Sequence, residues 1–398
     1  MAPFIVNSPV IHLTPQPLSS IIDQADRAAL LVSQVRGAML SPTARKTAPR
    51  FNASQVAALC GVERGQIAYR LSKGDLPSGT PNETGTRREF TLAETRTWVR
   101  AYRATARRPE RAEACVLTIA NFKGGVGKTT TAMSLAQGLS LRGHQVLCID
   151  CDPQGSLTTL HGILPDSEVA ENETILELCA GTERSIRPAI RSTYWDGIDL
   201  VAAAPLLFAA EFMLPARQSQ DPAFAFWDVL NLGIDDVRRD YDVIIIDTPP
   251  ALSYVTINAL MAANGIIMTL PPNALDVASS AQFWRLFSDL TAQLVERRAI
   301  TKEFDFIRVL LTRVDNNDAT ASVVREWIGK AYEGKVMPVE IPKTAVANSS
   351  AAEFGTVYDV TRYDGNNRTY KRAAEAYERV TELIEQLIQA VWRRQVQG

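Results

Sequence analysis

Apolar and polar residues follow each other in this chain as expected for strands that alternate with amphipathic helices. From residue 115 onward, short apolar runs rich in β-branched residues recur, and helical stretches separate them. Such runs are typical of strands buried on both faces of a sheet. We therefore predict an α/β fold with a mainly parallel sheet flanked by helices. The predicted strands are CVLTIAN (115–121), QVLCID (145–150), IDLVAA (198–203), YDVIIID (241–247), GIIMTL (265–270), FIRVLLT (306–312) and VMPVEI (336–341).

A separate helix is predicted near the N-terminus, as part of a helical arm. Its pattern ends near Gly37, ahead of the linker sequence SPTARKTAP (41–49). A lone amphipathic helix needs a partner for its apolar face, and both its own domain and a second copy of the chain stay open as that partner. Its apolar positions are Leu18, Ile21, Ile22, Ala25, Ala29, Val32 and Val35.

The patterns predict three parts: an arm with a dimerisation helix (1–47), a small compact domain (48–112) and the α/β domain (113–398). The polar segment ARRPERAE (106–113) marks the second boundary. The charges differ between the parts. Residues 1–114 hold 16 Lys/Arg and 9 Asp/Glu, whereas the remainder holds 26 and 35. A basic front on an acidic body favours an anionic partner for the front, with chance charge drift as the alternative.

Composition and the chain ends predict a cytoplasmic globular protein with no membrane association. Hydrophobic residues make up 46% and charged residues 22% of the chain, which excludes a disordered class. No run of 18 apolar residues exists, the N-terminus lacks signal-peptide features, and five scattered cysteines fit a reducing compartment. A final helix from about Thr369 to Arg394 carries an apolar stripe. We interpret it as core packing, because Glu382 and Glu385 interrupt any basic, membrane-facing side.

The strongest candidate for chemistry is NFKGGVGKTT, which spans residues 121–130 between a predicted strand and a predicted helix. That context is the one a phosphate-binding loop requires. Gly124, Gly125 and Gly127 let successive backbone N–H groups turn toward one anion without a Cβ in the way. Val126 lies within this cradle. The helix N-terminus adds its partial positive charge.

The next residues complete a site for ATP or ADP with Mg²⁺. Lys128 is expected to bridge the β- and γ-phosphates, Thr129 to bind Mg²⁺, and Thr130 to reach the α-phosphate side. The loop departs from an ordinary Walker A motif, because Phe122 stands where its first glycine belongs and Lys123 precedes the glycines. Lys123 cannot easily reach its own γ-phosphate, but it can reach a nucleotide across a face-to-face dimer. A solvated lysine is the alternative.

Carboxylates at the ends of two predicted strands belong to the same site. Asp247 ends the run VIIID and, as in a Walker B motif, is expected to hold Mg²⁺ through a water. Pro249 stops that strand beside the nucleotide. Asp152 lies 24 residues after Lys128 at a neighbouring strand end, so it can orient the attacking water or bind the metal. Asp150 is a second candidate near the metal, and a turn or cap role is the alternative for both.

Residues 51–71 have the pattern of a helix-turn-helix, in which Gly61 permits the turn. A Gly/Pro-rich, hairpin-like stretch follows and ends in a capping box from Thr91 to Glu94. Outward-facing residues of the second helix could reach base edges or phosphates. A small helical dimerisation module is the alternative. The residues expected to be buried are Val56, Ala57, Leu59, Val62, Ile67 and Leu71. The candidate DNA contacts are Arg64, Gln66, Arg70, Lys73, Arg87 and Arg88.

From about Leu117 to its end, the chain resembles the ParA/MinD group of deviant Walker A ATPases. The motifs that carry the resemblance are NFKGGVGKTT, DCDPQGSLT, IIIDTPP and IPKTAVANSSAAEFG. NETILEL, RSTYWDGIDLV, ALDVASSAQF, DFIRVLLTR and YKRAAEAYERVTELIEQL look closest to plasmid partition ATPases, particularly the RepA proteins of repABC-type replicons. The segment 51–94 resembles the winged helix-turn-helix of MerR-like regulators and of the larger partition ATPases.

The resemblance implies a plasmid partition ATPase. Members form an ATP sandwich dimer that coats nucleoid DNA nonspecifically, and a ParB-type partner stimulates their slow hydrolysis. By position, Lys123 is the cross-dimer lysine, Lys128 the phosphate lysine, and Asp152 the switch carboxylate. Arg313 stands where the family places its nucleotide-base pocket, and Lys343 where members present basic residues to DNA. The winged helix-turn-helix implies operator binding that represses the protein's own operon.

Two other classes of protein stay open as alternatives. A membrane-cycling positioning ATPase of the MinD type would use the final helix as its foot, but a basic DNA-reading front is superfluous there. A metabolic relative, such as an electron-transfer iron protein or an amidating synthase, is the other class. An iron–sulfur protein needs cysteine ligands, and no cysteine follows the Walker B strand.

Overall fold

The computed structural model describes residues 15–39, 46–82, 85, 87–298, 301–315, 318–343, 355–359 and 367–397. The chain divides into two compact units, Met1–Arg45 and Lys46–Gly398. The first unit contains the helix α1 (Leu18–Met39), which includes all the apolar positions of the helix predicted there. Leu18, Ile21, Ile22, Leu30 and Leu31 of this helix are all more than half exposed.

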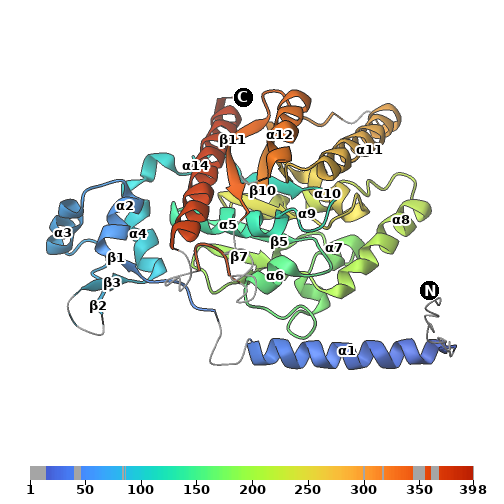
Figure 1. Ribbon diagram of the computed structural model, residues 1–398, viewed down its shortest axis with the longest axis horizontal. Helices are drawn as coiled ribbons and strands as arrows, with labels where there is room; N and C mark the ends of the chain where they lie inside the picture. Colours follow the sequence, from blue (N-terminus) through green and yellow to red (C-terminus); the bar gives the residue numbers. More distant parts are fainter. Residues whose placement is uncertain are drawn as a thin grey trace, which may run out of the picture. The chain divides into compact units, whose positions relative to one another are not determined.

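An eight-stranded sheet forms the centre of the second unit, in the order β11-β10-β9-β4-β8-β5-β7-β6 (Figure 1). Every neighbouring pair is parallel except β6 with β7 at one edge. This confirms the predicted fold class. The strands are β4 (Cys115–Ala120), β5 (Val146–Asp150), β6 (Arg191–Ser192), β7 (Ile198–Val201), β8 (Val243–Asp247), β9 (Gly265–Leu270), β10 (Phe306–Val314) and β11 (Val336–Pro342).

Two apolar cores cover the two faces of this sheet. Alternate residues of β4 show the division, since Leu117 and Ile119 belong to one core and Val116 and Ala120 to the other. The first core includes α5 (Lys128–Leu141) and α14 (Asn367–Gln397). The helices of the opposite side are α7 (Leu176–Ala180), α8 (Ala210–Gln220), α9 (Val229–Gly233), α10 (Tyr254–Ala262), α11 (Ala274–Arg298) and α12 (Ala319–Ala331).

The final helix, α14, is part of the core. Its residues Val380, Ile384, Ile388 and Trp392 are almost completely buried against α5 and the sheet. The interpretation of its stripe as core packing is therefore confirmed. Among the described residues, no helix combines the length and apolarity needed to cross a membrane.

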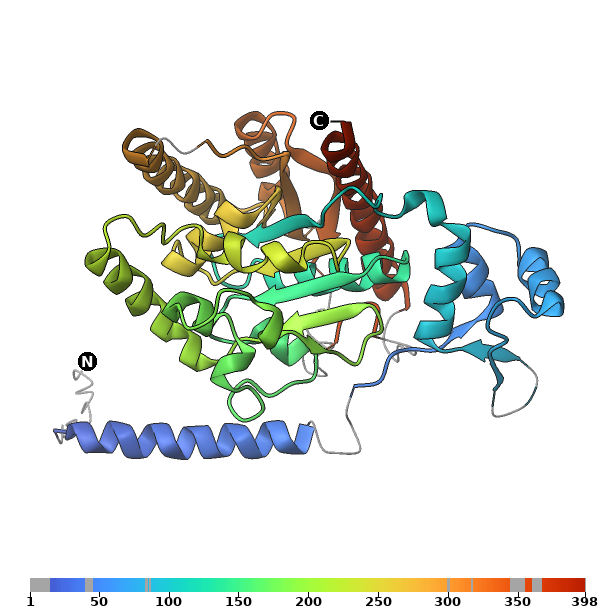
Figure 2. The same cartoon turned by 180° about the vertical axis from the view of Figure 1, so that it is seen from behind.

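A small module, residues 51–102, precedes the large sheet and is called here the HTH module. It contains α2 (Ala53–Cys60), α3 (Arg64–Lys73), α4 (Leu92–Tyr102) and an antiparallel sheet of β1 (Phe51–Asn52), β2 (Thr80–Pro81) and β3 (Arg88–Phe90). Gly61 makes the turn between α2 and α3 with a left-handed φ of 69°. Both Asn52 and Thr91 form capping boxes. Figure 2 shows the module beside α5 and α14.

Candidate nucleotide site and DNA-facing surfaces

The loop between β4 and α5 has the shape of an anion cradle. Gly125 and Gly127 adopt φ values of 72° and 88°, which L side chains rarely tolerate, and Gly127 caps α5. Gly124 and Gly125 are exposed, whereas Val126 is buried. Asn121 fixes the start of the loop by accepting the backbone N–H of Lys123 at 3.1 Å. The loop therefore presents backbone N–H groups at the helix N-terminus, where a phosphate would bind.

Lys128 points back into this loop. Its Nζ donates to the carbonyl oxygen of Lys123 at 3.0 Å, and the side chain is buried. Burial lowers the pKa of Lys128, while the charges of Asp247 and Asp152 act in the opposite direction. A buried ammonium group held against a glycine-rich loop is suited to bind a phosphate oxygen.

Asp247 is the most unusual group of the site. It is fully buried at the end of β8, and neither carboxylate oxygen has a hydrogen-bond partner in the part of the chain that the structure describes. Burial, with the neighbouring Asp150, raises the pKa of Asp247 to about 8. The Thr129 hydroxyl lies near enough to lower that pKa, although its geometry falls short of a hydrogen bond. Orphaned carboxylate oxygens beside a threonine hydroxyl fit a Mg²⁺ site.

The other two carboxylates differ in how far they are already occupied. Asp150 lies opposite Asp247 on β5 and accepts hydrogen bonds from the Thr158 backbone and hydroxyl at 2.9 and 2.8 Å. Burial raises its pKa to about 7. Asp152 accepts one hydrogen bond, from the backbone of Gln154 at 3.0 Å. Asp150 thus anchors α6 (Ser156–Leu160), and Asp152 keeps more capacity for a ligand.

Lys123 is not free in the single chain. Its Nζ forms an ion pair with Asp276 Oδ1 at 2.6 Å, with geometry that falls short of a hydrogen bond. Asp276 is 4% exposed in the first turn of α11. Asp276 was not among the predicted site residues, and its one signal in the sequence is its place in ALDVASSAQF, the segment that begins α11.

The end of β10 holds the phosphate loop from the other side. Arg313 adopts a left-handed φ of 52° and donates from Nη1 to the carbonyl oxygen of Gly125. The hydroxyl of Thr312 donates to the carbonyl of Val126 at 2.8 Å, a contact that sequence reasoning missed. Arg313 therefore lies on the phosphate loop itself. Pro249 is buried after β8.

The HTH module places its candidate residues at the surface. Arg64 and Gln66 are exposed on α3. Arg70 also faces outward, but it forms an ion pair with Asp75 at 2.7 Å and lies over the Tyr102 ring. This happens because Asp75 follows the helix closely enough to neutralise it. The remaining candidates Lys73, Arg87 and Arg88 are exposed.

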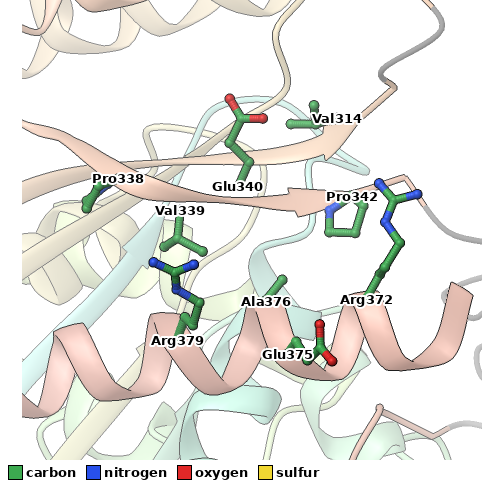
Figure 3. Close-up of a pocket in the computed structure, with 9 residues that line it drawn as sticks. All are labelled: Val314, Pro338, Val339, Glu340, Pro342, Arg372, Glu375, Ala376 and Arg379. Atoms are coloured by element: carbon green, nitrogen blue, oxygen red, sulfur yellow. The ribbon is translucent and has the colours of Figure 1, made fainter. Parts of the chain in front are cut away.

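Lys343 directly follows β11. A cavity of about 340 Å³ lies between β11 and α14 (Figure 3), and Pro342, the last residue of β11, lines it. Its side chain is 60% exposed and lies 3.7 Å from Asp315. Arg372 and Arg379 extend from α14 toward β11 at this cavity. They form no ion pair with any described residue. The surface near Lys343 therefore carries charges of both signs, because Glu340 and Glu375 line the cavity together with the two arginines. The other lining residues are Val314, Pro338, Val339 and Ala376.

Comparisons with known proteins agree with this geometry. A family model described as an AAA domain, AAA_31, matches residues 114–300. "Putative replication protein A" of Sinorhizobium fredii is 30% identical over 389 residues, 94% of this chain and 95% of the relative. Protein SopA of Escherichia coli is 29% identical over 88% of this chain and 92% of its own length. Chromosome partitioning protein ParA of Caulobacter vibrioides is 30% identical over 66% of this chain and 94% of its own length.

Solved structures share the fold. A structure titled "Partition Protein" matches with a TM-score of 0.67 and 18% identity, over 94% of this chain and 99% of that one. A cobyrinic acid a,c-diamide synthase from Mycobacterium smegmatis, with bound ATP analog and magnesium, matches with a TM-score of 0.53 and 29% identity. That match covers 68% of this chain and 93% of the synthase. The first likeness shows the fold, and the second comes from a chain that holds a magnesium nucleotide.

Proposed function

Because this chain belongs to the ParA family of partition ATPases, we propose that it segregates a plasmid-like replicon by cycles of ATP binding and hydrolysis. The observation that carries the proposal is Asp247, which lies near Lys128 and Thr129 and whose two buried oxygens have no hydrogen-bond partner within the described ranges. Leaving such a group unpaired costs free energy, which a bound cation offsets. The buried charges of the site all have partners only when a metal ion and an anion are bound.

The residues of the site divide the work. Backbone N–H groups of Gly124 to Gly127 and the Lys128 ammonium bind the phosphates. Thr129 and Asp247, with Asp152, would hold Mg²⁺, which neutralises charge that develops on the phosphates. Asp152 is also placed at the strand end where it orients the attacking water.

Dimerisation is the second element of the proposal. Lys123 reaches the nucleotide of a second copy and stabilises the charge of the transferred phosphoryl group there. For this, Lys123 must leave Asp276, to which it is bound in the single chain. The negative charge of the second copy's nucleotide then takes the place of the Asp276 carboxylate as the ion-pair partner of Lys123. Because this charge is present only when nucleotide is bound, the dimer depends on ATP. The exposed apolar residues of α1 provide a further surface for a second copy.

DNA binding is the third element. Arg64 and Gln66 on α3, with Lys73, Arg87 and Arg88 around the hairpin, contact an operator and repress the protein's own operon. Nonspecific binding to nucleoid DNA uses the exposed Lys343, with Arg372 and Arg379 of α14 as nearby cations. A ParB-type protein stimulates hydrolysis.

The other function classes have less support. A membrane foot on α14 would need its apolar face, which is buried in the core. The cobyrinic acid synthase matches only 68% of this chain. The putative replication protein A and SopA match 94% and 88% of it, so a partition function explains more of the chain than a metabolic synthase does.

One set of measurements tests the proposal. The purified chain is assayed for Mg²⁺-dependent ATP hydrolysis, for mass in solution, and for binding to the duplex directly upstream of its coding sequence. Each assay is run with no nucleotide, with ADP and with ATP, and a random duplex is the control. We expect a dimer with ATP and nucleotide-dependent DNA binding. A monomer at saturating ATP, with unchanged DNA binding, would overturn the proposal.

A further inference from the structure

Helix α5 connects two distant parts of the molecule. It begins at Lys128 in the nucleotide site and ends at Leu141, about 21 Å away for 14 residues. Residues 131–141 are all buried, between the sheet and α14. At its far end, α5 contacts α4 of the HTH module. Since a close-packed interior transmits displacement, movement of the phosphate loop reaches this contact.

Arg96 of α4 binds the far end of α5. Its guanidinium donates to the carbonyl oxygens of Ser140 at 3.1 Å and His144 at 2.8 Å. It also forms an ion pair with Asp196 at 2.5 Å, and Arg96 as a whole is 4% exposed. A Cβ added to Gly197 would lie 2.0 Å from the Arg96 guanidinium, so the glycine is what admits it. This cation satisfies carbonyls at a helix C-terminus, where it is also favoured by the helix dipole.

A second contact lies at the end of α4. Arg103 forms an ion pair at 2.8 Å with Glu385 of α14, which is 4% exposed in its side chain. The same carboxylate pairs with Arg142, just after α5, at 3.0 Å and contacts His144 Nε2 at 2.8 Å. Although burial acts to raise it, these hydrogen bonds hold the pKa of Glu385 at about 2. Glu385 therefore stays charged and joins α4, α5 and α14.

The segment that leaves the module is also fixed. Arg108 pairs with Asp242 at 3.3 Å and donates to the carbonyl of Arg239 at 2.6 Å. Ala112 is 1% exposed. The module cannot rotate against the large sheet unless these buried ion pairs break. Breaking one partner away from a buried pair is costly.

We propose that Arg96 and Arg103 form a joint through which the nucleotide site controls DNA binding by the HTH module. The proposal rests on the proposed function, because it assumes that the module binds DNA and that nucleotide state changes this binding. When a phosphate takes Lys128 Nζ from the carbonyl oxygen of Lys123, the start of α5 shifts, and the joint carries the shift into α4. A simple anchor predicts something different, because it would affect DNA binding equally in every nucleotide state.

The test compares DNA affinities with and without nucleotide. Arg103→Ala removes one contact and leaves Glu385 paired with Arg142. Arg96→Lys keeps a charge for Asp196 but cannot serve both carbonyl oxygens. Arg111→Ala is the control, because it removes an exposed arginine of the same segment. Labelled duplex from the region upstream of the gene, and a random duplex, are titrated with no nucleotide, ADP and ATP, while ATP hydrolysis and thermal unfolding are recorded.

The wild-type chain is expected to change its affinity for the upstream duplex by about 5- to 150-fold between nucleotide states. In both joint variants this ratio should fall to about twofold or less, with hydrolysis retained, and Arg111→Ala should keep the wild-type ratio. Retention of the full ratio in folded joint variants, or equal weakening in all states, overturns the joint. If Arg103→Ala does not fold, Arg96→Lys decides by the same criterion.

Failure of the proposed function gives a different result. In that case the wild-type chain stays a monomer at saturating ATP, and its DNA binding is the same in every nucleotide state. A wild-type chain that forms the ATP-dependent dimer and hydrolyses ATP, but binds the duplex with affinities independent of nucleotide, leaves the ATPase function intact and overturns only the joint.

Discussion

The nucleotide edge of the large sheet and the exposed face of α3 in the HTH module hold their charged and polar residues in opposite ways. Lys128, Asp152 and Asp247 are each less than a tenth exposed, and Asp247 lacks hydrogen-bond partners among the described residues. In the module, Arg64 and Gln66 lie in solvent. A buried, unpaired charge lowers the stability of the folded chain, whereas an exposed charge changes that stability very little. The charged groups of the first region therefore need a bound ligand as partner, whereas those of the second region are already satisfied by water.

This difference predicts the size of mutational effects. At the nucleotide edge, the charge of one side chain balances the charges of several others, so the loss of that side chain affects the whole site. In the module, each exposed side chain acts nearly alone, and its removal should cost only its own contact with DNA. The predictions below test this difference.

Lys128→Ala should have the largest effect. The variant loses a buried cation that faces Asp247 and Asp152 as well as the phosphates. We expect loss of ATP binding and a decrease in hydrolysis of about 100-fold or more. Binding of a fluorescent ATP analogue and steady-state hydrolysis measure this, with the exposed Lys330→Ala as a matched control. ATP binding at wild-type affinity would contradict the assignment.

Lys123→Ala should separate nucleotide binding from hydrolysis. The side chain is 41% exposed and pairs with Asp276, so its loss leaves the phosphate loop intact. We expect ATP to bind with nearly unchanged affinity, and either hydrolysis to fall by about 100-fold or the ATP-dependent dimer to be lost. Single-turnover hydrolysis and light scattering distinguish the two. Hydrolysis at the wild-type rate would show that the lysine does not act across a dimer.

Much of the fold follows from the sequence, because strands buried on both faces are long apolar runs. The run GIIMTL is β9 without a change of boundary. The predicted strand ends also place Asp247, Asp152 and the phosphate loop at one edge, since parallel strands share their carboxyl end. These features depend on local composition and on the general rules for parallel sheets.

Contacts between distant residues could not be predicted in the same way. Asp276 lies far from Lys123 in the sequence, and no spacing rule connects them. Arg70 has a helical position that faces outward, but Asp75 and Tyr102 attract its guanidinium. Arg96 and Glu385 look like surface residues of amphipathic helices, and only the tertiary packing of α4, α5 and α14 buries them. Such pairs depend on how elements dock, which a local pattern does not contain.

Arg64→Ala should have a moderate effect, confined to DNA. If Arg64 touches base edges, binding to the upstream duplex weakens by about 1–3 kcal/mol with little change on random DNA. Arg70→Ala should change operator binding less, because Asp75 and Tyr102 already occupy its guanidinium. Fluorescence anisotropy at fixed salt measures both. Equal losses on the two duplexes would assign Arg64 to phosphate contact, and a larger loss for Arg70→Ala would show that its ion pair opens on DNA.

His161→Leu should change only the pH dependence of stability, and it extends the comparison to a buried group away from the nucleotide. His161 is 3% exposed, and its ring nitrogens have no hydrogen-bond partner among the described residues. Burial, with the charge of Lys46, lowers the pKa of His161 from 6.5 to about 3. Between these values the unfolded chain binds a proton that the folded chain does not, so the free energy of unfolding falls as the pH falls.

From pH 7 to pH 5 this contribution amounts to about 2 kcal/mol, and Leu, which does not titrate, should remove it. Urea unfolding of both proteins at the two pH values measures the difference. Glu385 does not interfere, because its pKa is about 2 in the folded chain and its ordinary value is 4.5, below this window. An identical pH dependence in both proteins would mean that His161 takes up a proton as readily in the folded chain as in the unfolded chain, and would overturn the lowered pKa.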